Sequence, residues 1–291
     1  MSKAAVLKTI FAALVFIGGL AVFLYPIVSN FINEQSQTSL ISNFDEAVES
    51  LSDGDKTKSL EAAHAYNAAL VHGQGVIVDP FGEQTTNAEE DDQTLSFLSI
   101  GEIMGYVQIP KIGLKAPVYE GTSEEVLQKG IGWLSGTSLP VGGESSNTVL
   151  SGHRGLPTSK LFTDIDQLEV GDEFFFKNSI EVLAYKVIET KIIDPNAFEA
   201  LDIVEGHDRM TLLTCHPYMI NTHRLLVIGE RIPYEGQLEA IEEEKGLIGS
   251  ITGAQKDLMI GVLAVAALTG LALLVFLRSR RSRKKERSRN D

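Results

Sequence analysis

The chain has 291 residues and an acidic composition, with 39 Asp or Glu against 25 Lys or Arg and a net charge of −14. An excess of negative charge repels phosphate backbones, so nucleic acid is excluded from the expected partners. The only cysteine is Cys215, which excludes an intramolecular disulfide. About 230 residues lie between the two apolar ends, enough to bury a hydrophobic core without a covalent constraint.

The two ends of the chain differ from its middle. Residues 10–28 and residues 258–277 contain no charged residue. A helix needs about 20 apolar residues to cross the hydrocarbon of a bilayer, and both segments reach that length. The sequence therefore predicts a transmembrane helix at each end.

The charges beside these segments predict their orientation. Lys3 and Lys8 precede the first segment, and the tail at 278–291 holds eight Lys or Arg. Positively charged flanks stay in the cytoplasm, so both termini are expected there and residues 29–257 outside the cell. A basic run directly after a membrane span is a topology signal rather than a nucleic-acid patch, and it favours contact with anionic lipid headgroups.

The first apolar segment has a second interpretation. It also resembles a secretory signal peptide, with Pro26 positioned to break the helix before a cleavage site at Asn30. We favour an uncleaved anchor because that cleavage site is only a passable one.

Helical spacing follows the first apolar segment. Phe44, Val48 and Leu51 recur at helical intervals, and after the polar interruption SDGDKTK an alanine-rich stripe includes Ala63 and Asn67. We therefore expect helices between the first span and the glycines that follow this stripe.

The next segment, residues 76–99, is predicted to be a long loop. It contains the turn signal DPFG and an acidic run, Glu89 to Asp92. The acidic run lacks the alternating oxygen ligands of a calcium loop, so a solvated loop is the better interpretation. A loop of this length inside a compact domain is usually disordered or functional.

From Gly101 to Tyr234, β-rich runs alternate with glycine and proline. Such runs include SNTVLS, DEFFFK, EVLAYKVIETKII, DRMTLLTC and RLLVIGERI, with short helical signals in SEEVLQKG and SKLFTDIDQL. Several short strands separated by turns predict a mainly β domain, either a closed β-barrel or a β-sandwich.

The stretch TLLTCHPYMINTHRLL combines a thiol with a cation. Alternation places Leu213 and Cys215 on one face of a strand, and the eight residues HPYMINTH separate this strand from the next, which begins at Arg224. If the strands pair antiparallel, Cys215 and Arg224 lie opposite each other with Cβ atoms about 5 Å apart. A cation favours the reactive thiolate and stabilises a developing oxyanion, although a guanidinium accepts no proton.

A thiol nucleophile also needs a general acid and base, for which histidine is the usual residue. His216 and His223 adjoin the reactive positions, but neighbours on an extended chain tend to face apart. His207 lies in a turn before the strand, where we expect it to be solvated. His153, in VLSGHRGLP, ends a strand-like run between glycines that leave room for the imidazole. Spacing alone leaves the choice among His153, His216 and His223 open.

Two further interpretations of the cysteine remain. A zinc site of Cys215, His216 and His223 matches no common ligand spacing, so the spacing does not favour a metal site. A buried structural cysteine in a non-enzymatic surface scaffold is the other possibility, and it predicts an inert thiol.

The motif TLLTC, with Arg224 nine residues after Cys215 and SGHRG upstream, resembles the catalytic signature of sortases, which are membrane-anchored cysteine transpeptidases of Gram-positive-type bacterial surfaces. The runs IPKIGLKAPVYEGTSEEVLQKGIGWLSGTSLP and CHPYMINTHRLLVIGERI resemble the pilin-polymerising subgroup, class C. The similarity covers residues 76–234 and, in layout, the terminal segments. It implies an eight-stranded β-barrel with short helices, an N-terminal helical and lid region, and a transmembrane helix at each end.

The resemblance implies a role for each matching residue. Cys215 is the implied nucleophile, which attacks the threonine carbonyl of an LPxTG-like sorting signal on a pilin subunit. His153 is the implied acid and base, and Arg224 is the group that holds the substrate or stabilises the oxyanion. An acceptor lysine of the next pilin then resolves the thioacyl intermediate, without a cofactor or metal.

Class C sortases carry a lid with a DP-aromatic motif, which corresponds here to Asp79, Pro80 and Phe81. We expect Asp79 to pair with Arg224 through a charge-assisted contact and Phe81 to shield Cys215 from water. An ordinary Asp-Pro turn is the alternative.

The same catalytic residues are compatible with two related reactions. One is the anchoring of surface proteins to peptidoglycan, and the other is hydrolysis by a thiol hydrolase with water as the acceptor. The second predicted span and the DPF loop favour pilin polymerisation.

The expected organisation has eight segments. They are a cytoplasmic N-terminus (1–9), a transmembrane anchor (10–28), a helical region (29–75), a lid loop (76–99), a catalytic β-barrel (100–234), a linker helix (235–257), a second transmembrane helix (258–277) and a basic cytoplasmic tail (278–291).

Overall fold

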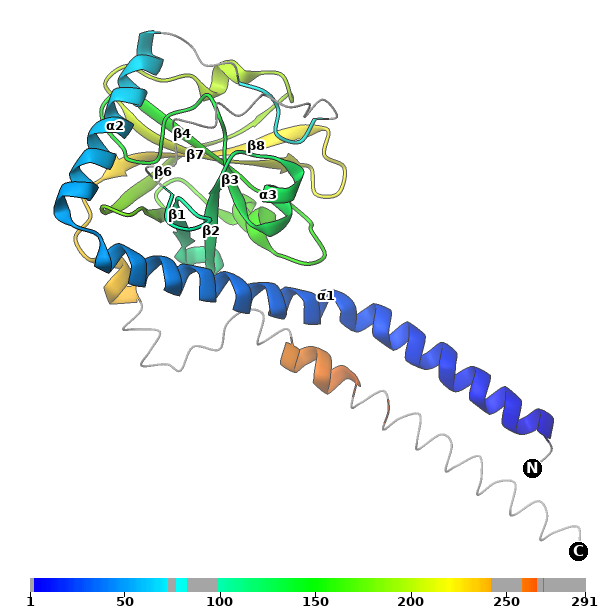
Figure 1. Cartoon of the computed structure of the whole chain (residues 1–291). Helices are drawn as coiled ribbons and strands as arrows, with labels where there is room; N and C mark the ends of the chain where they lie inside the picture. The colour runs from blue at the N-terminus through cyan, green and yellow to red at the C-terminus, as the bar shows by residue number, and fades with distance from the viewer. Residues whose placement is uncertain (1–2, 73–76, 83–98, 242–257, 266–268, 270–291) are drawn as a thin grey trace, which may run out of the picture. The chain divides into compact units, whose positions relative to one another are not determined.

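The computed structural model describes residues 3–72, 77–82, 99–241, 258–265 and 269 (Figure 1). The chain divides into two compact units, residues 1–32 with 251–291 and residues 33–250. In chain order the described elements are α1 (Lys3–Ser50), α2 (Asp53–His72), β1 (Gly105–Ile109), η1 (Pro110–Ile112), β2 (Leu114–Glu120), α3 (Glu124–Lys129), β3 (Ile131–Trp133), β4 (Ser146–Ser151), η2 (Leu161–Gln167), β5 (Glu173–Lys177), β6 (Val182–Ile193), η3 (Phe198–Leu201), β7 (Asp208–His216) and β8 (His223–Ile232), where η denotes a 3-10 helix.

The strands of the larger unit form one closed barrel in the order β1-β2-β3-β4-β7-β8-β6-β5. The β2–β3 and β4–β7 pairs are parallel, and the other pairs are antiparallel. The expected eight-stranded barrel is therefore confirmed, and the sandwich alternative is wrong. Three residues are too few to show alternation, which is why β3 was not among the strands expected from sequence.

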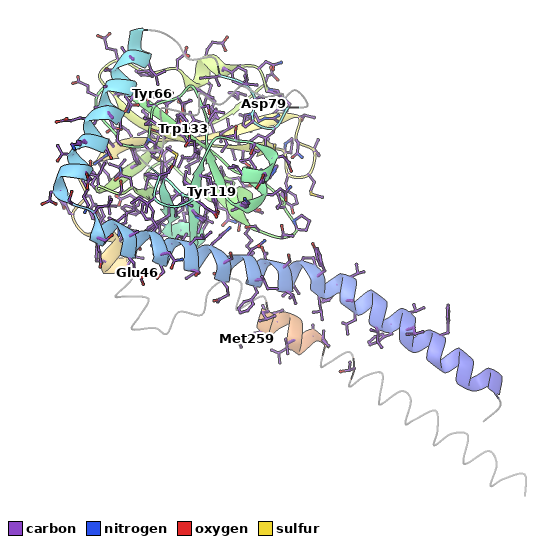
Figure 2. The ribbon with its side chains drawn as sticks, in the orientation of Figure 1. Glu46, Tyr66, Asp79, Tyr119, Trp133 and Met259 are labelled. Atoms are coloured by element: carbon purple, nitrogen blue, oxygen red, sulfur yellow. The ribbon has the colours of Figure 1, made fainter. Side chains whose placement is uncertain are left out.

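The barrel interior is filled by a large apolar cluster that includes Trp133, Phe174 and Tyr185. The helix α2 covers this cluster, since Ala63 is fully buried in it and Tyr66 meets Trp133 edge to face at 6.3 Å (Figure 2). The predicted apolar stripe of this helix is thus confirmed as its packing face.

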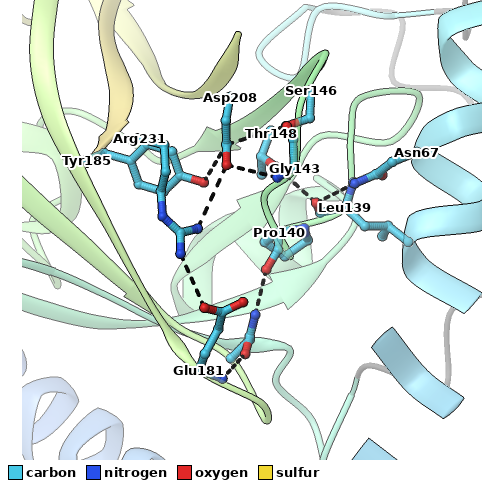
Figure 3. Close-up of polar contacts among 11 residues, drawn as sticks. Asn67, Leu139, Pro140, Gly143, Ser146, Thr148, Glu181, Tyr185, Asp208 and Arg231 are labelled. Carbon is cyan, nitrogen blue, oxygen red and sulfur yellow. Dashed lines mark hydrogen bonds and ion pairs between the residues drawn. The ribbon is translucent and has the colours of Figure 1, made fainter. Parts of the chain in front are cut away.

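A pair of hydrogen bonds also fixes α2 to the barrel. The Asn67 side chain accepts from the backbone N–H of Leu139 at 2.7 Å and donates to its carbonyl at 3.2 Å (Figure 3). A buried amide that both donates and accepts with one residue specifies a single docking position for the helix.

The part of α1 that belongs to the larger unit packs on the barrel through a separate apolar cluster. Ile41 and Phe44 are buried there against Ile103, Tyr106 and Tyr119. The helical stripe expected from sequence therefore contacts the outside of β1 and β2.

The helix boundaries differ from those expected. A single helix runs from Lys3 to Ser50 and includes Pro26, so no break separates the apolar segment from the following helix. The second helix begins at Asp53, inside the polar run SDGDKTK that was expected to separate the two helices. Ser52 caps this helix, because its hydroxyl accepts from the backbone N–H of Asp55 at 3.2 Å.

Within the described residues, α1 is the one helix whose length and apolar composition suffice to cross a bilayer, with a mean hydropathy of 2.0 in its most apolar window. Residues 258–265 are also helical, and a Cβ added at Gly261 would lie 2.9 Å from Ile27. The absence of a side chain at Gly261 permits this close approach of the two helical segments. The rest of the second expected span, the acidic run and most of the linker lie outside the described residues.

A second apolar cluster lies on the other face of the strands that carry the candidate residues. Leu212 belongs to the large cluster, whereas its neighbour Leu213 packs with Val149 and Leu226 in the second one. Ile77 and Phe81 of the 77–82 segment cover this second cluster. The alternation expected in TLLTC is thereby confirmed, and it directs Cys215 to the face covered by that segment.

Candidate active site

Cys215 and Arg224 face each other across the β7–β8 hairpin. They are registered partners in the antiparallel ladder, one step before the last pair, His216 and His223. Both side chains are buried, with 5% of each residue exposed. The expected thiol–guanidinium pair is therefore a consequence of strand register.

The hairpin loop is shorter than expected. β7 extends through His216 and β8 begins at His223, so the loop between them has six residues rather than the expected eight. The strand pairing includes these two histidines because their backbone groups satisfy each other in the ladder.

His153 is brought to the same end of the barrel by the parallel pairing of β4 with β7. The last registered pair of these strands is Ser151 with Leu213. His153 follows Ser151 by two positions, and Cys215 follows Leu213 by two positions. Beyond that pair, the Gly152 N–H donates to the Leu213 carbonyl at 3.1 Å, and the Thr214 hydroxyl donates to the Gly152 carbonyl at 2.6 Å. These bonds hold the residue before the imidazole against the residue before the thiol.

Glycine is required at position 152 for a steric reason. A Cβ there would lie 2.8 Å from the Phe162 ring, which is fully buried in the barrel core. The room that glycine leaves is thus taken by Phe162 rather than by the imidazole, which corrects the reason expected from sequence.

The 77–82 segment closes over these residues. The Asp79 carboxylate accepts from Nε of Arg224 at 2.9 Å and from Nη2 at 2.5 Å, in the bidentate geometry that guanidinium and carboxylate prefer. The Phe81 ring lies 5.5 Å from the His153 ring and 5.4 Å from the Arg224 guanidinium carbon, and Pro80 between them is buried. The expected Asp79–Arg224 contact is present in the structure.

The electrostatics around the thiol oppose its ionisation in this arrangement. Burial raises the pKa of Cys215 to about 11; Arg224 acts to lower it, and Asp79 acts to raise it further. Asp79 therefore counteracts the cation that would otherwise favour a thiolate. The thiol is protonated at neutral pH while this segment is in place.

The imidazole is also kept neutral. Burial lowers the pKa of His153, and the nearby carboxylate of Glu124 partly offsets this. Among the described residues, Nε2 of His153 is buried without a hydrogen-bond partner and lies 3.8 Å from the Glu124 carboxylate. Sequence spacing alone did not single out Glu124, because it lies on α3, remote from both motifs.

The other histidines of the region have partners of their own. Nδ1 of His216 lies 3.3 Å from Arg154, and Nε2 of His223 lies 3.5 Å from Asp194. His207 is 2.6 Å from Glu230, so it is paired rather than simply solvated as expected. In the described part of the chain, no group of three or more His, Cys, Asp or Glu is arranged to hold a metal ion.

Fold and site together define a class of protein: a closed eight-stranded β-barrel with a cysteine, a histidine and an arginine gathered at one end. The family model for the sortase domain matches residues 107–232, which include all three. The chain is 48% identical to sortase C-1 from Streptococcus pneumoniae, with a TM-score of 0.63, covering 68% of this chain and 100% of that one. It is 44% identical to sortase C1 from Streptococcus agalactiae, with a TM-score of 0.62, covering 67% and 95%. The chain belongs to the sortase family.

Curated relatives match over a shorter region. Sortase D of Bacillus subtilis (strain 168) is 31% identical over 135 residues, which are 45% of this chain and 65% of that protein. Sortase A of Bacillus anthracis is 27% identical over 131 residues, 45% and 60% of the two proteins. The chain thus spans less than two thirds of the length of these relatives.

Proposed function

We propose that the protein is a cysteine transpeptidase that polymerises pilin subunits. The observation that carries the proposal is the register of Cys215 with Arg224 at the barrel end where β4 delivers His153. The relatives add support: one solved sortase C with 42% identity is described as pilus-related, and another, with 46% identity, in terms of pilin substrate specificity.

The first half-reaction forms a thioester. Sγ of Cys215 attacks the carbonyl carbon of the threonine in an LPxTG-like sorting signal, and the Thr–Gly amide bond breaks as the thioester forms. His153 takes the proton of the Cys215 thiol as Sγ attacks and then gives it to the departing glycine amine. Arg224 donates hydrogen bonds to the carbonyl oxygen while that oxygen carries negative charge.

The second half-reaction transfers the threonine to a lysine. The side-chain amine of the next pilin attacks the thioester carbon and gives a proton to His153, which passes it to the departing thiolate of Cys215. An isopeptide bond forms, and the protonated thiol of Cys215 is restored. The reaction conserves the energy of the cleaved amide and needs no cofactor.

The segment that carries Asp79, Pro80 and Phe81 acts in this proposal as a lid. With the lid in place, Asp79 occupies the Nε–Nη2 edge of Arg224, while Nη1 donates to the Asn221 and His223 carbonyls, and Phe81 lies against the imidazole. A substrate carbonyl needs the same guanidinium, so the lid must leave before the sorting signal binds. Its departure also removes the burial and the carboxylate that raise the pKa of Cys215.

The membrane part of the proposal follows from both ends of the chain. We propose that α1 anchors the protein, that a second span follows near the C-terminus with both termini in the cytoplasm, and that the barrel lies outside the cell. In this placement the enzyme meets pilins at the outer membrane surface, where their sorting signals are exposed.

The test is a reconstitution with the full chain in detergent. We expect that incubation with a pilin carrying an LPxTG-like signal yields covalent oligomers, and that mass spectrometry maps a bond from the signal threonine to a pilin lysine. Cys215→Ala should reduce the rate by at least about 10⁴-fold while leaving the fold intact. Products that end in a free threonine carboxylate would indicate a hydrolase, and transfer only to a peptidoglycan-type amine would indicate an anchoring sortase.

A further inference from the structure

Arg154 follows His153 in sequence and is almost fully enclosed, with 6% of its side chain exposed. Its guanidinium contacts two other elements. Nε donates to the Thr163 carbonyl at 3.1 Å and Nη2 to the Asp166 carboxylate, both on η2. Nη1 lies 3.3 Å from Nδ1 of His216, at the end of β7. A charged side chain with its fork directed into fixed partners is not a solvated loop residue.

The contact between Arg154 and His216 joins the neighbours of the reactive pair. Arg154 is one residue after His153, and His216 is one residue after Cys215. The strand bonds of β4 and β7 end just before these residues, at Gly152 and Thr214. Arg154 therefore continues the connection between the two chain segments beyond the last backbone bond.

The chemistry of the two groups assigns the direction of this bond. A guanidinium only donates, so Nδ1 of His216 is the acceptor and the His216 ring carries its proton on Nε2. Tyr218 closes the arrangement, since its ring lies 5.8 Å from the Arg154 guanidinium carbon. Gly155 lets this loop approach: a Cβ there would be 3.0 Å from the Tyr218 ring.

We propose that Arg154 is a positioning residue that holds His153 beside Cys215, with His216 as its anchor on β7. The inference rests on the proposed function, in which His153 moves protons between the substrate amines. Proton transfer is sensitive to geometry, and a displacement of about 1 Å costs up to about 100-fold in rate. His216 thereby has a structural reason to lie next to the nucleophile without taking part in the chemistry.

The first experiment needs no sorting signal. The rate at which a thiol reagent labels Cys215 is measured against pH in the full chain in detergent, with Asp79→Ala and Phe81→Ala in every variant so that access does not limit labelling. A neighbouring imidazole changes the pH profile of a thiol, so His153→Ala moves the profile. We expect Arg154→Gln to move it in the same direction, by at least about half as much.

The second experiment measures transpeptidation with the native lid. We expect Arg154→Gln to lower kcat by about 10- to 100-fold with KM within about twofold. Arg154→Lys keeps the charge but replaces the planar fork with a point charge, so it should recover only part of kcat. A purely structural role would instead lower the melting temperature without changing the pH profile of the thiol.

A matched pair of variants at His216 covers the case in which Arg154→Gln fails to fold. His216→Asn keeps an acceptor near the position of Nδ1 and should retain the starting profile, whereas His216→Leu removes the acceptor and should shift it. Equal profiles for these two variants would overturn the anchoring role.

The outcomes also separate this inference from the proposed function. If Arg154→Gln keeps the starting profile while His153→Ala changes it, Arg154 does not position the imidazole, and the transpeptidase proposal stands. If His153→Ala itself leaves the profile unchanged, the thiol and the imidazole do not act as a pair, and both proposals fail.

Discussion

Two arginines on β8 each face an aspartate, and the origin of the aspartate distinguishes them. Arg231 lies near the end of the strand, and its Nη1 is 3.9 Å from Asp208 of the neighbouring strand β7 (Figure 3). Arg224 lies near the start of the strand, and its partner Asp79 is 145 residues away in the chain. One carboxylate belongs to the barrel, and the other comes from a segment laid over it.

Arg231 and Asp208 belong to a network of hydrogen bonds and ion pairs within the barrel. Asp208 accepts from the Gly143 N–H at 2.8 Å and from the Tyr185 hydroxyl at 3.1 Å, while Arg231 also donates to Glu181 at 3.2 Å. All of these residues lie in strands or short connections of the barrel, so the contacts exist whenever the barrel is folded.

The site at the other end of β8 is incomplete by comparison. Nε2 of His153 is buried and has no hydrogen-bond partner in the part of the chain that the structure describes, and the buried thiol of Cys215 has a pKa raised to about 11. The barrel closes without the 77–82 segment, which packs on the second apolar cluster through Ile77 and Phe81. Burial of an ion pair therefore does not by itself identify a permanent contact. A carboxylate on a barrel strand stays with its arginine, whereas a carboxylate on a segment outside the barrel can move away from it.

The largest expected effect is on the permanent network. Asp208→Ala should lower the free energy of unfolding by about 3 kcal/mol, because it leaves the Tyr185 hydroxyl and the Gly143 N–H without their shared acceptor and removes one of the two carboxylates beside Arg231. Chemical denaturation measures this change. Asp208→Asn, which keeps an acceptor oxygen, is the matched control and should lose less.

The comparison breaks down if the two aspartates behave alike. Asp79→Ala should lower the free energy of unfolding by less than about 1 kcal/mol, since Arg224 regains water once the lid is displaced. An equal loss in Asp79→Ala and Asp208→Ala would mean that the lid is as permanent as the barrel network.

The next largest effect concerns the thiol. Asp79→Ala with Phe81→Ala should raise the labelling rate of Cys215 at pH 8 by up to about 100-fold, because the thiol returns toward its ordinary pKa and becomes accessible. Val78→Ala, at an exposed position of the same segment, is the control and should leave the rate unchanged. An unchanged labelling rate in the double variant would show that the 77–82 segment does not act as a lid.

A smaller effect follows from proton linkage. The folded chain raises the pKa of Cys215 to about 11, so its contribution to stability is present below the pKa of the unfolded chain, near 9, and is lost as pH rises toward 11. The stability difference between the native chain and Cys215→Ala should therefore change across this window and stay constant below it. Denaturation of both chains at several pH values tests this, and a change confined to acidic pH would contradict it.

The smallest expected effect is at His223, opposite His216 but paired with an exposed aspartate. His223→Ala should change kcat/KM by no more than about twofold. A loss comparable to that of His153→Ala would mean that proton transfer had been assigned to the wrong histidine.

Alternation along TLLTC and along the strand that begins at Arg224 led to the Cys215–Arg224 pair once the strands were taken as antiparallel, because the loop that joins two strands of a hairpin sets their register. The topology of the barrel was harder to predict from the sequence. Its closure depends on β3, which has three residues, and on the parallel pairing of β4 with β7, which periodicity cannot reveal. Spacing therefore left the choice of histidine open, and the preference for His153 rests on the resemblance to sortases.

The contacts of Arg154 illustrate what sequence reasoning missed. Its partners Asp166 and His216 are 12 and 62 residues away, and a single arginine beside a glycine carries no signal of burial. The one visible indication was the presence of a cation directly after the candidate histidine. The signal-peptide alternative for the first apolar segment placed a helix break at Pro26, whereas α1 continues through it.

The parallel pairing of β4 with β7 has a consequence for biogenesis. Strands β5 and β6 lie between them in sequence, so the chain must complete most of the barrel before residue 153 approaches residue 215. Contacts of such long sequence separation form late in folding. The thiol of Cys215 is accordingly exposed, with its ordinary pKa, until the native topology encloses it and brings residue 153 to the same end of the barrel.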